Sequence, residues 1–160
     1  MVTMECFDIV SMINGVLQSI EILAKQKEAM IRFGQQEPVY VWADEFKTEE
    51  VFMNYFSNAI NYAGREKIID VKLVKYENTV RISVFNTGNP IPEESIGHLW
   101  EKFYKVDKAH TREYGGNGIG LSIVKKIIED HGGYIWATSK EGEGTCMHFV
   151  LRKYIVNNKE

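Results

Sequence analysis

Three asparagines are spaced along one face of a predicted helix. Apolar residues recur at helical spacing from Asp44 to about Ala63, and Asn54, Asn58 and Asn61 fall there at i, i+4 and i+7, with Tyr62 beside them. Asparagine is a poor helix former, and lysine or glutamate would suit a merely solvated face better. Amide oxygens suit a hard cation such as Mg²⁺, which keeps waters and phosphate oxygens among its ligands. The stripe therefore predicts a metal–phosphate site.

A glycine-rich segment, Gly115–Leu121, opens another predicted helix. Glycines before a helix amino end expose backbone N–H groups that bind phosphate oxygens. The segment is not a P-loop, because no Lys-Ser or Lys-Thr follows, and no preceding strand gives it the setting of a dinucleotide fold. The polar stretch Val106–Gly116 comes before it instead, which is typical of a lid that closes over phosphates.

Two shorter segments carry weaker signals. Asn86-Thr87-Gly88-Asn89-Pro90 follows a predicted strand, and a short polar side chain next to a glycine suits recognition of a planar base. An ordinary turn explains the same residues. Gly142-Glu143-Gly144-Thr145 precedes the last predicted strand, and a tight hairpin turn accounts for it when it is taken alone.

The elements that would position these residues follow from hydrophobic periodicity. Helices are predicted over Phe7 to about Lys27, from the capping residue Asp44 to about Ala63, near Glu94–Lys102 and over Gly118–His131. Strands are predicted over Met30–Phe33, Val39–Ala43, Ile69–Tyr76, Thr79–Phe85, Tyr134–Thr138 and Thr145–Arg152. These elements predict an α+β fold, a two-layer sandwich in which three helices cover one face of a mixed sheet of about five to seven strands.

The composition of the chain limits the classes of protein to which it can belong. The 160 residues suit one domain, and the net charge of −3 with scattered lysine and arginine gives no support to a nucleic-acid partner. No apolar run approaches the roughly 20 residues of a spanning helix, and no signal peptide is recognised, so we expect a soluble, intracellular chain. Cys6 and Cys146 match no metal spacing; a reduced pair is the simpler reading, with one disulfide as the alternative.

Taken together and in order, the segments resemble the five conserved boxes of the histidine-kinase catalytic domain, within the GHKL ATPase superfamily and its Bergerat fold. The matching segments, which correspond to the N, G1, F, G2 and G3 boxes, are residues 54–62, Asn86–Gly88, Leu99–Tyr104, Gly116–Leu121 and Gly142–Thr145. The resemblance extends from about Phe7 to Leu151. It implies a catalytic ATP-binding domain over residues 1–155, with residues 1–6 as a remnant of a link to a dimerisation domain and residues 156–160 as a flexible tail.

The resemblance also implies roles for particular residues. Asn54 and Asn58 would hold Mg²⁺ on the ATP phosphates, and Tyr62 would lie beside the nucleotide. The remaining nucleotide-binding residues implied in this way are Asn61, Asn86, Gly88, Lys105, Arg112, Gly116, Gly118, Ile119, Gly120, Leu121 and Thr145. Among these, the three glycines of the G2 box would form the hinge and phosphate contacts of the lid, and Thr145 would lie near the adenine.

Two of these positions depart from the family pattern. Asn61 stands where the family often has lysine or arginine, and Lys105 and Arg112 are candidates to supply the missing charge. Asn86 stands where the family usually has the aspartate that accepts a hydrogen bond from the adenine amino group. An amide oxygen still accepts that bond, but it loses about 1 kcal/mol of charge-assisted strength. We expect adenine selectivity to survive with weaker affinity.

The catalytic expectation is phosphoryl transfer to a protein. Hydrolysing relatives carry a glutamate where this chain has Asn54, and an asparagine cannot act as a general base. The phosphoacceptor histidine of such kinases lies on an upstream helical hairpin, and none of His98, His110, His131 and His148 has that setting. The partners implied are a dimerisation and phosphoacceptor domain of the same kinase and a response regulator. The implied location is cytoplasmic, with the full-length kinase anchored in a membrane.

Two other readings stay open. One is a GHKL-type ATPase or ATP-driven switch, against which Asn54 argues. The other is a degenerate nucleotide-binding regulatory module, for which Asn61 and Asn86 leave room.

Overall fold

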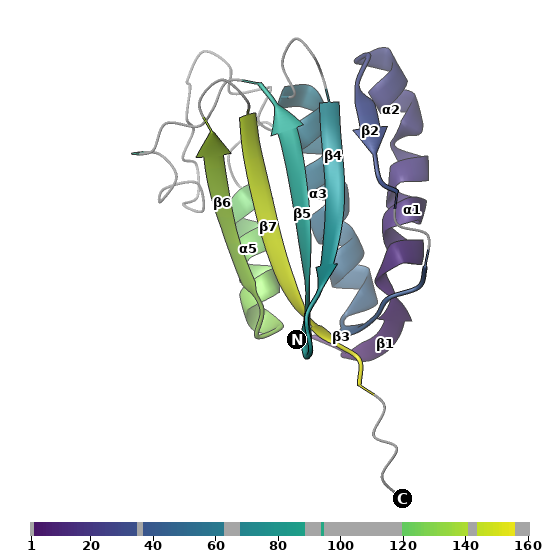
Figure 1. The fold of residues 1–160 in the computed structure, drawn as a ribbon, viewed down its shortest axis with the longest axis vertical. Coiled ribbons are helices and arrows are strands. Elements are labelled where there is room, and N and C mark those ends of the chain that lie inside the picture. Colours follow the sequence, from purple (N-terminus) through teal and green to yellow (C-terminus); the bar gives the residue numbers. More distant parts are fainter. Residues whose placement is uncertain are drawn as a thin grey trace, which may run out of the picture.

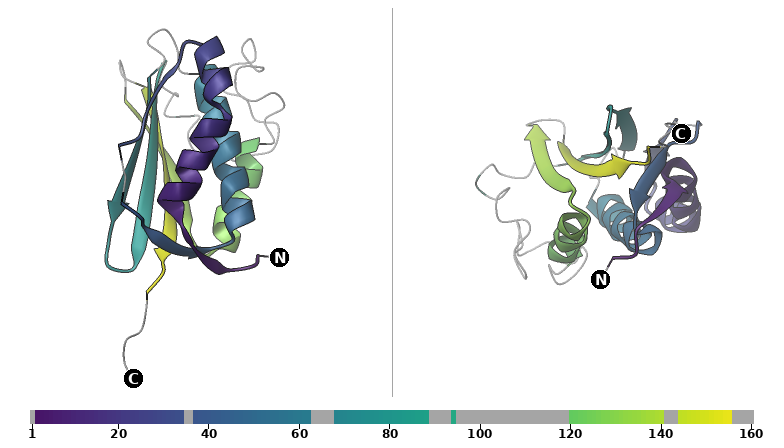
Figure 2. Two further views of the ribbon diagram at one scale, coloured as in Figure 1. Left: turned by 90° about the vertical axis from the view of Figure 1, so that its right-hand side faces the viewer. Right: turned by 90° about the horizontal axis from the view of Figure 1, so that it is seen from below.

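The protein is built as one sheet with helices on one of its faces, as seen in a computed structural model (Figures 1 and 2). The structure describes residues 2–34, 37–62, 68–88, 94, 120–140 and 144–155. The strands are β1 (Glu5–Asp8), β2 (Met30–Arg32), β3 (Tyr40–Ala43), β4 (Ile68–Lys75), β5 (Thr79–Thr87), β6 (Tyr134–Lys140) and β7 (Gly144–Lys153). The helices are α1 (Ile9–Ser19), α2 (Glu21–Gln26), α3 (Glu45–Tyr62) and α5 (Gly120–Asp130).

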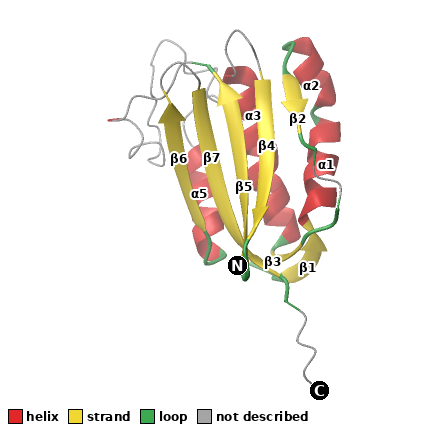
Figure 3. Ribbon diagram, viewed as in Figure 1, coloured by secondary structure: helices red, strands yellow, loops and turns green. Residues whose placement is uncertain are grey.

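The sheet is mixed, with seven strands in the order β1-β3-β7-β5-β4-β2 and with β6 paired to β7 (Figure 3). The β2–β4 pair is parallel, and the other five pairs are antiparallel. Strand β7 is the longest and contacts three neighbours: β5 along nearly its whole length, β6 along its first part and β3 at its end. It therefore fixes the relative register of the strands that carry the candidate site.

The core lies between the sheet and the helices, because alternate residues of each strand point to that face. On β5 the buried residues are the even-numbered ones from Val80 to Asn86, and on β7 they are the odd-numbered ones from Thr145 to Leu151. Phe52 and Phe56 of α3 contact each other, and Phe52 also meets Phe149 of β7 edge to face at 5.4 Å between ring centroids. Burial of these aromatic rings fixes α3 over the centre of the sheet.

The predicted two-layer α+β sandwich is confirmed, and the predicted first helix differs from the structure in two respects. Phe7 is not in a helix but in β1, which pairs with β3 through Phe7 and Val41. The helix begins only at Ile9, after Asp8 accepts a hydrogen bond from the N–H of Val10 as an N-cap. The predicted helix to Lys27 is also interrupted at Ile20, which separates α1 from α2.

The structure also tests expectations about the helix cap, the cysteines and membrane-spanning helices. Asp44 caps α3 as predicted, because its Oδ1 accepts from the N–H of Lys47 at 3.1 Å. Cys6 and Cys146 are both free, so the disulfide alternative is wrong. Within the described part of the chain, none of the helices has both the length and the apolar character needed to cross a membrane.

Candidate nucleotide site

Three consecutive rungs of the sheet change from apolar to polar toward one end. Each rung crosses β5, β7 and β6 on the helix-covered face. The rungs are Ile82–Phe149–Ile135, Val84–Met147–Ala137 and Asn86–Thr145–Ser139. The first two rungs belong to the hydrophobic core and its margin, whereas the third presents an amide and two hydroxyls. A polar rung at the end of a core row is a place where a mostly apolar ligand with a polar edge can bind.

Asn86 and Thr145 form the buried part of this rung. Asn86 is 4% exposed and Thr145 is 3% exposed. The Nδ2 of Asn86 donates to the carbonyl oxygen of Thr87 at 3.3 Å, which leaves its Oδ1 as the acceptor to be offered to a ligand. The hydroxyl of Thr145 is buried and has no hydrogen-bond partner in the described part of the structure. Buried polar groups normally have partners, so this hydroxyl calls for an explanation.

Glycines allow the backbone to close around this rung. Gly144 has φ +147°, and a Cβ built on it would lie 2.1 Å from the backbone oxygen of Asn86. Only glycine fits at this position. Gly88, with φ +139°, follows β5 directly. Gly144, the glycine of the predicted hairpin turn, thus allows the backbone of β7 to lie close to the backbone of Asn86.

The ends of two helices lie at the same end of the sheet. The N–H of Ile68 donates to Thr87 Oγ1 at 3.0 Å, so β4 begins beside the end of β5. Helix α3 ends at Tyr62, shortly before Ile68, and therefore runs toward this end (Figure 1). Helix α5 begins there at Gly120, continues with Leu121 and packs against α3.

The predicted residues divide into three groups. Asn86, Gly88, Thr145, Gly120 and Leu121 lie at the same end of the fold, on β5 or directly after it, on β7 and on α5. Asn54 lies on α3 and is half-buried, while Asn58, Asn61 and Tyr62 lie farther along the same helix. The predicted residues outside the described part are Lys105, Arg112, Gly116, Gly118 and Ile119.

Sequence reasoning missed Ser139 as a member of the polar rung. The signal was present, since Ile135, Ala137 and Ser139 alternate with exposed residues along β6. What the sequence did not contain was the register that places Ser139 opposite Thr145.

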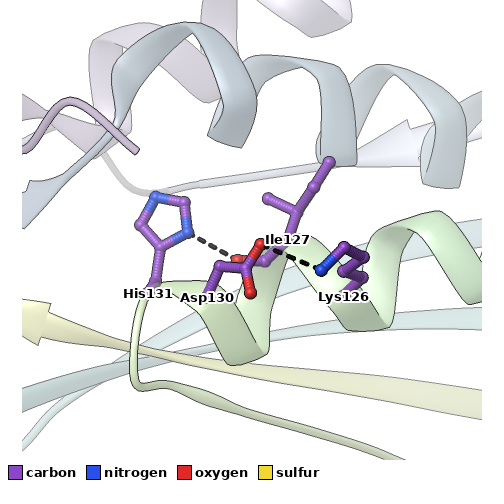
Figure 4. Close-up of polar contacts among 4 residues, drawn as sticks. All are labelled: Lys126, Ile127, Asp130 and His131. Carbon is purple, nitrogen blue, oxygen red and sulfur yellow. Dashed lines mark hydrogen bonds and ion pairs between the residues drawn. The ribbon is translucent and has the colours of Figure 1, made fainter. Parts of the chain in front are cut away.

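The two described histidines have structural contacts. His131 is 5% exposed; its Nε2 accepts from the backbone N–H of Asp44 at 2.9 Å. Its Nδ1 therefore carries the proton and donates to the carbonyl of Ile127 at 2.7 Å, beside the Lys126–Asp130 ion pair (Figure 4). His148, on the opposite face of the sheet, stacks on Trp136, and its ring nitrogens contact the hydroxyls of Ser83 and Thr138. These contacts give both histidines structural roles.

The carboxylate of Asp44 lies where α3, the end of α5 and the amino-terminal segment meet. It is 6% exposed and accepts from the N–H groups of Thr3 and Lys47. Burial raises the pKa of this carboxyl, but the two backbone hydrogen bonds and the charge of Lys47 outweigh burial, so the pKa lies below its usual value.

Comparison with known proteins agrees with the fold. Residues 43–155 match the family described as histidine kinase-, DNA gyrase B- and HSP90-like ATPase. The chain is 35% identical over 159 residues to the sensor protein kinase WalK of Staphylococcus epidermidis, covering 98% of this chain and 26% of that protein. It therefore spans about a quarter of the length of that relative.

Solved structures of histidine kinases share this fold. The catalytic domain of histidine kinase ThkA superposes with a TM-score of 0.82 at 31% identity, covering 95% of this chain and 97% of that domain. ThkA solved in complex with the response regulator protein TrrA matches with a TM-score of 0.79 at 30% identity, covering 94% of this chain and 42% of the ThkA chain. The family match covers well over half of the residues, and its segment contains both Asn86 and Thr145. The chain accordingly belongs to the histidine kinase-, DNA gyrase B- and HSP90-like ATPase family.

Proposed function

We propose that the chain binds Mg-ATP and is the catalytic domain of a sensor histidine kinase, transferring the γ-phosphoryl group to a histidine on a separate dimerisation domain. The observation that carries this proposal is the buried pair Asn86–Thr145, which ends two core rows with an amide oxygen and with a hydroxyl that has no partner among the described residues. These groups suit the polar edge of an adenine ring whose faces lie against apolar side chains.

The roles of the residues follow from their chemistry. Asn86 Oδ1 accepts from the adenine amino group, and Thr145 Oγ1 supplies a second hydrogen bond to the base. Asn54 and Asn58 on α3 are suited to hold Mg²⁺, since amide oxygens are hard ligands; the ion, when bound, neutralises charge on the phosphates. Tyr62 and Asn61 lie beyond them along α3, and Gly88, Gly120 and Leu121 border the site.

The phosphate-binding part of the proposal depends on the lid. Lys105 and Arg112 are proposed as the phosphate cations, in place of the charge missing at Asn61. Gly116, Gly118 and Ile119 are proposed as lid contacts to the phosphates. Asn54 offers no general base for water, which favours transfer to a protein acceptor over ATP hydrolysis.

The partners proposed are the dimerisation and phosphoacceptor domain of the same kinase and a response regulator. The ThkA complex with the regulator TrrA supports the second of these. We propose residues 1–155 as one catalytic domain, with residues 1–6 joining it to the dimerisation domain and 156–160 as a tail. Its proposed place is the cytoplasmic side of a membrane-anchored kinase.

A phosphoryl-transfer assay tests this function. The chain is mixed with radiolabelled Mg-ATP and a purified dimerisation domain bearing the acceptor histidine. A matched acceptor with that histidine changed to glutamine serves as the control. We expect acid-labile label on the first acceptor only. Nucleotide binding without any transfer would contradict the kinase assignment.

A second candidate is a nucleotide-binding regulatory module without transferase activity. The observation in its favour is the loss of charge at two family positions, Asn61 and Asn86. The same assay separates the two candidates, because the module binds the nucleotide but labels neither acceptor.

A further inference from the structure

Two hydroxyls on adjacent strands at the end of the sheet have no hydrogen-bond partner in the described part of the chain. Ser139 on β6 pairs with Thr145 on β7, and the Oγ of Ser139 and the Oγ1 of Thr145 are both buried without a partner among the described residues. Directly opposite residues of an antiparallel pair have Cβ atoms about 5 Å apart. The two unsatisfied groups are therefore neighbours.

Hydroxyls on the other face of the same strands are paired. Ser83 Oγ contacts His148 Nδ1 at 2.8 Å, and Thr138 Oγ1 contacts His148 Nε2 at 3.1 Å. Thr138 and Ser139 are consecutive residues, so the sheet satisfies one hydroxyl and leaves the next one unpaired. Among the described residues of β5, β6 and β7, the two buried hydroxyls without a partner both lie on the side that carries Asn86.

Packing alone does not account for a serine at position 139. The preceding residues on this face of β6 are Ile135 and Ala137, which join the core and its margin. An alanine at 139 would continue that row without burying an unsatisfied hydroxyl, which is unfavourable in a protein interior. A ligand that pairs with the hydroxyl removes this disadvantage.

We propose that Ser139 is a further base-binding residue, which extends the Asn86–Thr145 pair to a third strand and hydrogen-bonds the bound purine. This inference rests on the proposed nucleotide-binding function. A serine hydroxyl both donates and accepts, so it can pair with a ring nitrogen or with an exocyclic amino group. Two strand spacings separate Asn86 from Ser139, about 10 Å, so Ser139 contacts the side of the base that lies away from Asn86.

The test compares Ser139→Ala with Ser83→Ala, the same substitution on the opposite face of the sheet. Each variant of the full chain is titrated with Mg-ADP and, separately, with Mg-tripolyphosphate, which has phosphates but no base. Thermal unfolding of each free protein shows that the fold is retained. We expect Ser139→Ala to weaken Mg-ADP binding by roughly three- to tenfold, the range of one hydrogen bond. Tripolyphosphate binding is expected to be unchanged, and Ser83→Ala to bind both probes as the wild type does.

The outcomes separate this inference from the function on which it rests. If the wild type binds Mg-ADP and Ser139→Ala binds it equally well, Ser139 is not a base contact and the proposed function stands. A loss of affinity for both probes would also overturn the inference, because it would place the effect outside the base. If the wild type binds no nucleotide, the proposed function fails and Ser139 has no base to bind.

A double-mutant cycle with Thr145→Val tests whether the two hydroxyls act on the same base. We expect the combined variant to lose less Mg-ADP affinity than the product of the two single losses, because each removal displaces the same edge of the ligand. Losses that multiply fully would contradict a shared contact.

Discussion

Asn86 on β5 and Thr145 on β7 lie directly opposite each other, and each ends a row of core residues with a buried polar side chain. The amide of Asn86 is oriented by Thr87, while the Thr145 hydroxyl has no partner among the described residues. The pair is therefore as buried as the core but has hydrogen-bonding capacity left over. That combination underlies the proposed base site.

Two different substitutions of Asn86 should change nucleotide affinity in opposite directions. Asn86→Ala removes the acceptor for the adenine amino group and should weaken Mg-ADP binding about tenfold, or about 1.4 kcal/mol. Asn86→Asp gives a charge-assisted bond and should tighten binding about fivefold. Isothermal titration measures both, and equal affinities for all three proteins would place the base elsewhere.

Two buried threonines provide a matched comparison of stability and binding. Thr48 on α3 is 0% exposed, and its hydroxyl, like that of Thr145, has no partner among the described residues. Valine removes the hydroxyl at nearly constant volume, so Thr48→Val and Thr145→Val should each stabilise the free domain by about 1 kcal/mol. Only Thr145→Val should weaken Mg-ADP binding, by about fivefold. Urea unfolding and titration measure the two effects; a loss of binding in Thr48→Val would contradict the assignment of Thr145 as the ligand contact.

Much of the fold could be predicted because its elements have clear periods. The hairpin of β4 and β5 and the helix α3 appear in the sequence as alternation and as helical spacing, with Asp44 as the cap. Phe7 was misassigned because strand β1 is an edge strand of four residues, too short for alternation to stand out from the helical pattern that follows. Its strand conformation comes from pairing with β3, a contact that only the tertiary structure contains.

The site could be predicted in part for a related reason. Asn86 and Thr145 were recognisable from short motifs at strand ends, but their pairing depends on the register of β5 against β7. Ser139 and the contact between His131 and Asp44 carry no local motif, since each depends on residues that are distant in sequence or on a neighbouring strand. Sequence patterns thus identify residues near a ligand more readily than they identify which residues face one another.

Gly144 should tolerate no side chain. Gly144→Ala forces a Cβ against the backbone of Asn86 at a φ that favours glycine, and should destabilise the domain by about 3 kcal/mol. Gly15 is the control, because it is exposed on α1 and a Cβ there has nothing within 4 Å. Gly15→Ala should stabilise by about 0.5–1 kcal/mol. Denaturant unfolding measures both, and a Gly144→Ala protein as stable as the wild type would show that the close approach of β7 to Asn86 is not required.

The charge of Asp44 should stabilise the domain at pH values above the range in which its carboxylate becomes protonated. The pKa of this carboxyl is lower in the folded protein than its ordinary value of 3.8, so the stabilisation is present above that pH and is lost as pH falls through the folded pKa. Asp44→Asn keeps a capping side chain but removes the charge, and should cost about 1 kcal/mol at pH 7. The gap in unfolding free energy should stay constant down to about pH 5 and close below about pH 4.

Glu50→Gln, an exposed position on the same helix, serves as the control for Asp44→Asn and should change the unfolding free energy little at pH 7. A gap between wild type and Asp44→Asn that persists unchanged to pH 3 would mean that the carboxylate charge is not what stabilises the junction of α3 with His131.

The most direct test of the central claim is calorimetric titration of the chain with ADP and a non-hydrolysable ATP analogue, with and without Mg²⁺, alongside Asn58→Ala. We predict binding that is strengthened by Mg²⁺ in the wild type, and loss of that strengthening in Asn58→Ala while the variant keeps its thermal stability. Absence of binding by either nucleotide at millimolar concentration would contradict a nucleotide site between α3 and the Asn86–Thr145 end of the sheet.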